Sequence, residues 1–66
     1  MKRMFRYLLA FDAADGTKMV AEFNSNDEYL SFKKELDTQG LPNQLVNERE
    51  FESLKYRGAG YLDLRD

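Results

Sequence analysis

The segment FDAADGTKM, residues 11–19, combines two carboxylates and a glycine, the residue types of a cation-binding loop. An EF-hand loop places oxygen ligands at alternating positions over twelve residues and ends on a bidentate Glu. Here alanines, a threonine and a lysine fill the remaining positions, and Asp12 and Asp15 are the two carboxylates. Because Asp and Gly also favour tight turns, we predict a hairpin loop here and a fold that needs no metal.

The segment GAG, residues 58–60, is the second candidate for chemistry, because closely spaced glycines can cradle a phosphate. A dinucleotide-binding fingerprint requires a third glycine where Asp63 stands, with a strand before it and a helix after it. The chain offers neither the glycine nor that order of elements. We interpret this segment as a connection and expect no nucleotide or other cofactor.

Catalytic groups are scarce, since the chain has no cysteine and no histidine. The commonest general base and the most reactive nucleophile are therefore both missing. The candidate nucleophiles, without a histidine to activate them, are the hydroxyl groups of Thr17, Ser25, Ser31 and Ser53. A chain of 66 residues also has little material for a deep pocket, so we expect a protein that is not an enzyme.

Basic residues gather at the start of the chain, in MKRMFRYLLAF. Cations interleaved with aromatic residues are typical of surfaces that bind single-stranded nucleic acid. If the last strand lay beside the first, the basic cluster would comprise Lys2, Arg3, Arg6, Lys55, Arg57 and Arg65. The net charge of −2 opposes such binding, and Phe5 and Tyr7 fall on the face expected to be buried. Weak nucleic-acid binding is therefore our alternative hypothesis.

The apolar segments are short, and the longest near the start is YLLAF, residues 7–11. A secretory signal needs a longer apolar stretch, and a membrane-spanning helix needs about 20 residues. We therefore expect no membrane segment and a soluble cytoplasmic protein, with residues 1–66 forming one small domain.

Period-two alternation on either side of residues 13–17 predicts a β-hairpin. A three-residue loop with Gly16 in the left-handed conformation puts apolar residues opposite one another. The pairs are Phe11 with Met19, Leu9 with Ala21 and Tyr7 with Phe23, while Asp12 faces Lys18 on the other side. A two-residue turn would mix the faces.

A helix should follow, because Ser25 and Glu28 form a capping-box pattern. Its apolar stripe consists of Tyr29, Phe32 and Leu36, with Leu30 at the edge. A glycine at position 40 and a proline at position 42 end it.

The second half is more ambiguous. Asn47 and Glu50 suggest another helix cap, with Gly58 as the stop, whereas the competing interpretation makes residues 52–56 a strand. Alternating Leu62 and Leu64 indicate a final strand. We predict an α+β fold with a small single-layer antiparallel sheet, the N-terminal β-hairpin plus the C-terminal strand, packed on one or two helices. The order is ββα(α)β, and the alternative is ββαββ.

The second face of the hairpin suggests a function. Helices on one side of a three-stranded sheet would leave Leu8, Ala10 and Val20 as an apolar strip, rimmed by Arg6 and Glu22. Rimmed apolar patches are typical of interfaces. We therefore hypothesise a small regulator or accessory subunit that binds a protein partner or a second copy here. The alternative is that the terminal segments cover the strip within one chain.

Overall fold

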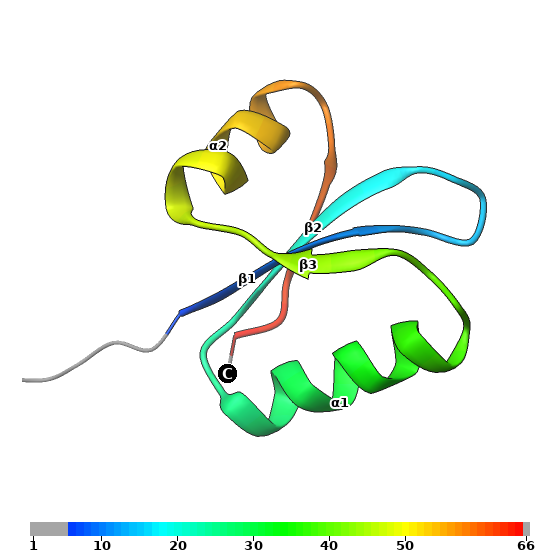
Figure 1. Cartoon of the computed structure of the whole chain (residues 1–66). Helices are drawn as coiled ribbons and strands as arrows, with labels where there is room; N and C mark the ends of the chain where they lie inside the picture. The colour runs from blue at the N-terminus through cyan, green and yellow to red at the C-terminus, as the bar shows by residue number, and fades with distance from the viewer. Residues whose placement is uncertain (1–5, 66) are drawn as a thin grey trace, which may run out of the picture.

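A four-stranded mixed sheet with one helix on each face forms the fold (Figure 1). The structure, a computed structural model, describes residues 6–65. In chain order the elements are β1 Tyr7–Asp12, β2 Lys18–Phe23, α1 Asn26–Thr38, β3 Asn43–Leu45, α2 Glu48–Tyr56 and β4 Gly60–Asp63. The predicted α+β class is confirmed.

The hairpin of β1 and β2 has the predicted register, with Phe11 opposite Met19 and Leu9 opposite Ala21. Gly16 has a φ of 86°, the left-handed conformation that the three-residue loop requires. Asp15 is used by the loop itself, because its Oδ1 accepts a hydrogen bond of 3.0 Å from the Thr17 N–H. A hydrogen bond from the Thr17 hydroxyl, together with this backbone bond, lowers the pKa of the Asp15 carboxyl. The loop chemistry thus accounts for the carboxylate that had suggested a cation site.

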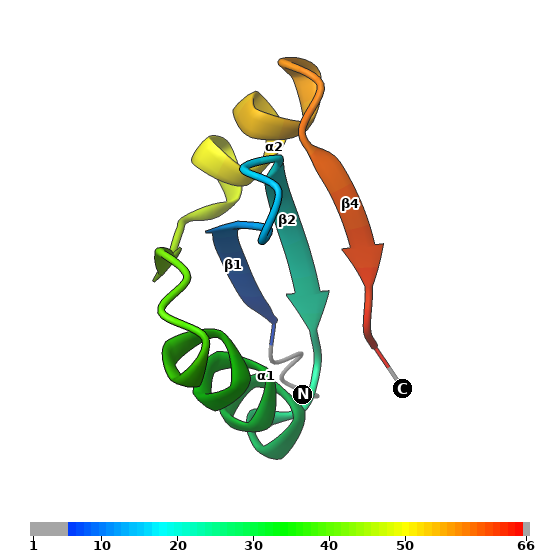
Figure 2. The same ribbon diagram turned by 90° about the vertical axis from the view of Figure 1, so that its right-hand side faces the viewer.

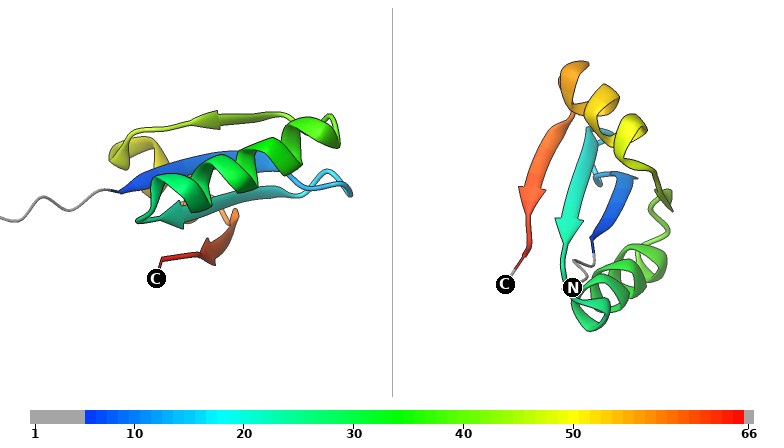
Figure 3. Two further views of the ribbon diagram at one scale, coloured as in Figure 1. Left: turned by 90° about the horizontal axis from the view of Figure 1, so that it is seen from below. Right: turned by 90° about the vertical axis from the view of Figure 1, so that its left-hand side faces the viewer.

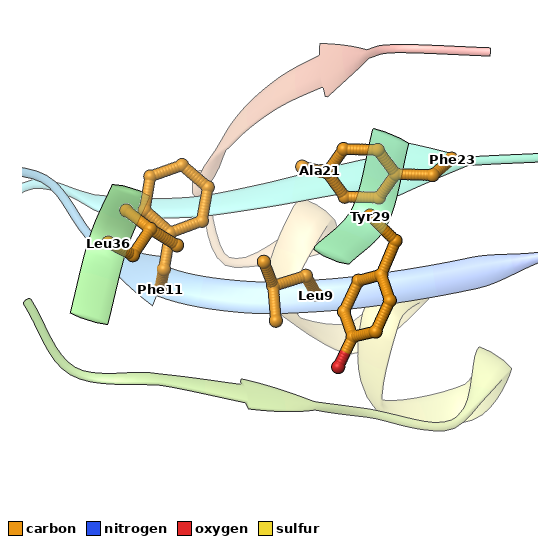
Figure 4. Close-up of a cluster of buried hydrophobic side chains, with 6 residues drawn as sticks. All are labelled: Leu9, Phe11, Ala21, Phe23, Tyr29 and Leu36. Atoms are coloured by element: carbon orange, nitrogen blue, oxygen red, sulfur yellow. The ribbon is translucent and has the colours of Figure 1, made fainter. Parts of the chain in front are cut away.

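Helix α1 covers the sheet face that carries Leu9 and Phe23, hereafter face A. Its predicted N-cap is confirmed, since the Ser25 Oγ accepts from the Glu28 N–H at 3.4 Å. The core beneath α1 mixes aromatic and aliphatic side chains, and Figure 4 shows its buried members: Leu9, Phe11, Ala21, Phe23, Tyr29 and Leu36.

Strand β3 was not predicted, and it changes the topology. The strand order is β3-β1-β2-β4, with β3 antiparallel to β1 and β4 parallel to β2. The expectation of an all-antiparallel sheet is therefore wrong at its last strand, and the order of elements is ββαβαβ. The physical reason is the position of α2. This helix connects strands at opposite edges, and a helical crossover returns the chain in the direction of the strand it left.

The two helices lie on opposite faces of the sheet (Figure 2). The β2–α1–β3 and β3–α2–β4 connections are both right-handed crossovers, as is usual for parallel strands (Figure 3). The first connection runs across the sheet from β2 to β3, and the second runs the opposite way from β3 to β4. Two crossovers of the same handedness that run in opposite directions place their helices, α1 and α2, on opposite faces of the sheet. Residues 48–56 are helical, as the first of the two interpretations held, and the strand interpretation is wrong. The second face, hereafter face B, is covered by α2.

Candidate functional site

The apolar strip predicted as an interface belongs to face B and is buried beneath α2. Phe51 packs against Leu8 and Val20, and the side chains of Phe51 and Val20 are both 0% exposed. Ala10 lies at the margin of this cluster, together with Val46 and Leu54. The prediction of an exposed strip is corrected: the strip is a second core, because α2 has an apolar stripe of its own that must be buried.

The two predicted rim residues form an ion pair in which Glu22 is buried and Arg6 remains partly exposed. Glu22 is 4% exposed, and its carboxylate accepts hydrogen bonds from Arg6 Nε at 2.5 Å and from the Tyr61 hydroxyl at 2.9 Å. The hydrogen bond from Arg6 holds the pKa of Glu22 below its usual value, while burial and the bond to Glu22 raise the pKa of Tyr61. Arg6 also donates to Glu48 at 2.6 Å, which ties β1 to the start of α2. The hydrogen bonds from Arg6 and Tyr61 compensate the buried charge of Glu22, which therefore has a structural role.

The basic cluster proposed for nucleic acid is partly assembled and largely neutralised. Lys2 and Arg3 lie outside the described residues. The structure brings Arg6 and Arg65 to Glu22, and Arg65 also forms two hydrogen bonds of 2.8 and 2.9 Å with Asp63. The Lys55 ammonium stands 4.6 Å from the centre of the Tyr61 ring, with Glu52 at 3.9 Å.

Arg57 is the exception in this cluster. It caps the C-terminus of α2 and makes no salt bridge with any residue in the range 6–65. A continuous row of free cations is therefore not formed within the described part of the chain, which weakens the nucleic-acid hypothesis.

A hollow of about 280 Å³ opens beside α2 at the hairpin end of face B. Its lining includes Ala10, Leu54 and the Asp12–Lys18 ion pair of 2.8 Å, and no serine, threonine or tyrosine contributes to it. Within residues 6–65 no group of three or more carboxylates is placed to hold a metal ion. Neither described helix is long and apolar enough to span a bilayer. The ionisable groups that line the hollow are Asp12, Lys18 and Glu50.

The free edge of β3 is the feature that the described fold leaves open. The Asp12 N–H donates to the Pro42 carbonyl at 3.0 Å, and the Val46 N–H donates to the Leu8 carbonyl at 2.9 Å. Because successive residues of a strand direct their backbone groups to opposite sides, Gln44 also faces β1. The N–H and C=O groups of Asn43 and Leu45 therefore point away from the sheet, where no described strand pairs with them.

Two exposed leucines flank this edge on face A. Leu45 pairs with Leu9, so both side chains share that face, yet Leu45 is 54% exposed. Leu30 of α1 is 50% exposed and lies one helical turn before Lys33, whose Nζ donates to Asn43 Oδ1 at 2.9 Å. We call the open backbone of Asn43–Leu45, with the side chains of Leu45 and Leu30, the β3 edge surface.

The β3 edge surface also lacks the charges that usually protect sheet edges. Residues 38–47 form the longest uncharged stretch of a chain in which a third of the residues are charged. The opposite edge, β4, carries Asp63, with Arg65 just beyond it, and has Tyr61 anchored to Glu22. Natural proteins usually protect edges with charges, proline or bulges. No charged side chain lies on β3, which is three residues long and directly follows Pro42.

Local structure on both sides holds β3 rigidly. Gly40, at a φ of 71°, ends α1, and the Leu41 N–H then donates to the Leu36 carbonyl at 2.9 Å. The Asn43 amide donates to Asp37 at 2.8 Å and to the Leu41 carbonyl at 2.9 Å. The bond from Asn43 lowers the pKa of the Asp37 carboxyl. On the other side, Asn47 caps α2 by accepting from the Glu50 N–H at 2.7 Å. The edge is thus preformed.

Strand β3 could not be predicted from the sequence pattern, because three residues are too few to show a period. Two signals could have indicated the β3 edge surface. Residues 38–47 are uncharged between charged neighbours, and Leu30 lies outside the stripe that buries α1.

Comparison with known proteins adds no assignment. The chain matches no protein-family model, and no curated protein or solved structure gives a match to it. Function must therefore be argued from the geometry.

Proposed function

We propose that this chain is a small non-catalytic interaction protein, a regulator or accessory subunit, that binds an extended polypeptide along the β3 edge surface. In this mode a strand from the partner joins the sheet and pairs with the N–H and C=O groups of Asn43 and Leu45. Main-chain hydrogen bonds then supply affinity. The side chain that lands beside Leu45 on face A supplies selectivity.

The observation that carries this proposal is the combination of an open backbone edge with two half-exposed leucines in an uncharged segment. Isolated exposed leucines are common and mean little. Here Leu45 lies on a strand whose outward backbone groups have no strand partner in the described part of the fold, and Leu30 lies on the helix that packs beside this strand. The partner segment should therefore be extended, with an apolar residue opposite Leu45 and polar residues on alternate positions.

The alternative function, weak nucleic-acid binding through the basic cluster, has less support. The guanidinium groups of Arg6 and Arg65 are committed to Glu22, Glu48 and Asp63. Binding a phosphate backbone would require breaking those pairs or relying on the remaining, separated cations.

A peptide-display selection, with a library of random peptides as the probe, tests the proposed function. With the wild-type protein as bait, enriched peptides should alternate apolar and polar residues. Their binding should be lost in Leu45→Lys, because a charged side chain on the edge opposes strand addition. Tyr56→Lys is the matched control, since Tyr56 is 93% exposed on α2, and binding should be unchanged. Peptides that bind Leu45→Lys as tightly as the wild type would contradict the proposal.

A further inference from the structure

The β3 edge surface is self-complementary in its backbone. Two β3 strands placed antiparallel about a two-fold axis would each offer the same outward N–H and C=O groups to the other. Closed two-fold symmetry is the commonest arrangement of protein oligomers. We infer that the polypeptide bound by this edge is β3 of a second copy, giving a symmetric dimer with a continuous eight-stranded sheet. This inference rests on the proposed function and names its partner.

The side chains favour one register, with Leu45 on the two-fold axis. Leu45 of one copy then lies opposite Leu45 of the other on face A, and Asn43 lies opposite Asn47. Such an apolar cross-strand pair is stabilising, whereas like charges directly opposite are destabilising. A two-fold axis brings a residue next to its own copy in the other chain, so a charged residue at the axis would be repelled by the identical charge of its copy. The uncharged segment of residues 38–47 satisfies this requirement.

The same register brings Leu30 of each copy close to the two-fold axis. Asn43 lies beside residues 33 and 37 of α1, to which it is hydrogen bonded. Leu45 lies two strand residues beyond Asn43, a distance of about 6.6 Å along β3. Because α1 runs in the opposite direction to β3, the same distance corresponds to about four residues toward the N-terminus of α1. The axis therefore passes near Leu30, and the two α1 helices run antiparallel on face A.

Dimerisation would also remove both unprotected edges. The combined sheet would have the order β4-β2-β1-β3-β3-β1-β2-β4 and would end on the two β4 edges, which carry Asp63 and the anchored Tyr61. An extended peptide from another protein would cover one edge. Pairing with a second copy covers the β3 edges of both chains, and it brings the exposed leucines of both chains together.

Sedimentation velocity tests the association. The paired segment is short, so the dimer should be weak and should form progressively between about 1 μM and about 1 mM. We expect Leu45→Lys to be monomeric throughout and Tyr56→Lys to dimerise as the wild type does. A wild type that stays monomeric would overturn this inference, while peptide binding that depends on Leu45 would leave the proposed function standing. Association unaffected by Leu45→Lys would place the dimer on another surface and also overturn it.

Disulfide trapping tests the register, because the chain has no native cysteine. Directly opposite residues in a hydrogen-bonded antiparallel pair have Cα atoms about 5.5 Å apart, which suits a disulfide. Under copper phenanthroline and air, Leu45→Cys should form covalent dimers at least tenfold faster than the control Tyr56→Cys, although residue 56 is the more exposed of the two positions. Equal rates would overturn the register.

Discussion

Replacing Leu8 by glutamate is the sharpest test of whether face B is core or an open surface. Leu8 is 6% exposed and packs beneath Phe51 of α2. Its cross-strand neighbour is Glu22, whose carboxylate already takes up Arg6. A carboxylate at position 8 would therefore be buried beside a like charge and would compete for the same guanidinium.

The cost of Leu8→Glu can be compared with the stability that a chain of this size has. Loss of the buried leucine costs about 2 kcal/mol. Burying a carboxylate without a full partner adds several kcal/mol more. At roughly 0.05–0.15 kcal/mol per residue, a domain of 66 residues has about 3–10 kcal/mol in total. The variant should therefore be largely unfolded at 25 °C.

Urea denaturation followed by far-ultraviolet circular dichroism measures this effect. Leu45→Glu is the matched control, because the same substitution at a side chain that is 54% exposed should change the free energy of unfolding by less than about 0.5 kcal/mol. A Leu8→Glu variant with the helical signal and unfolding midpoint of the wild type would refute the assignment of face B as core. That result would show that Leu8, Ala10 and Val20 form a solvent-exposed strip.

Three further predictions follow from the local contacts. Glu22→Gln should destabilise the fold at neutral pH by about 2 kcal/mol, since it leaves Arg6 without its main partner. The folded-state pKa of Glu22 lies below its usual value, so the carboxylate stabilises the fold above the unfolded-state pKa, and this contribution is lost as pH falls through the folded-state pKa. Unfolding curves for both proteins should therefore converge in acid, and a constant gap between them would contradict this role. Asn47→Ala should cost about 1 kcal/mol through loss of the α2 cap, measured by urea denaturation, whereas an unchanged midpoint would show that the cap contributes nothing. Single-stranded DNA should bind weakly and lose affinity steeply with added salt in fluorescence anisotropy, and nanomolar affinity at physiological salt would revive the nucleic-acid alternative.

The parts of the fold that were predictable from sequence are those with strong local signals. The hairpin register followed from the alternation of Leu9 and Phe11 against Ala21 and Met19, because a slip by one residue would have mixed the two faces. The first helix followed from its cap at Ser25, since this motif satisfies backbone groups locally. Neither inference depended on distant contacts.

The parts that failed depend on long-range topology. Strand β3 is held by pairing with β1 and by the Asn43 side chain, and three residues give no period of their own. Without β3 the chain seemed to have three strands, and both helices were placed on one face. The burial of Leu8 and Val20 under Phe51 follows once β3 and β4 occupy opposite edges, because α2 must then cross face B. The location of the open surface depended on that topology as well.

Amide hydrogen exchange, read residue by residue by NMR, tests most directly the claim that β3 is the binding edge. The free protein at low concentration should exchange the Asn43 and Leu45 amides rapidly, while that of Gln44, paired with β1, is protected. On binding a selected peptide, or on raising the protein concentration into the range of the dimer, the Asn43 and Leu45 amides should become protected, with little change at Tyr61 and Asp63 on the β4 edge. Binding that leaves the Asn43 and Leu45 amides as fast as before would contradict the account.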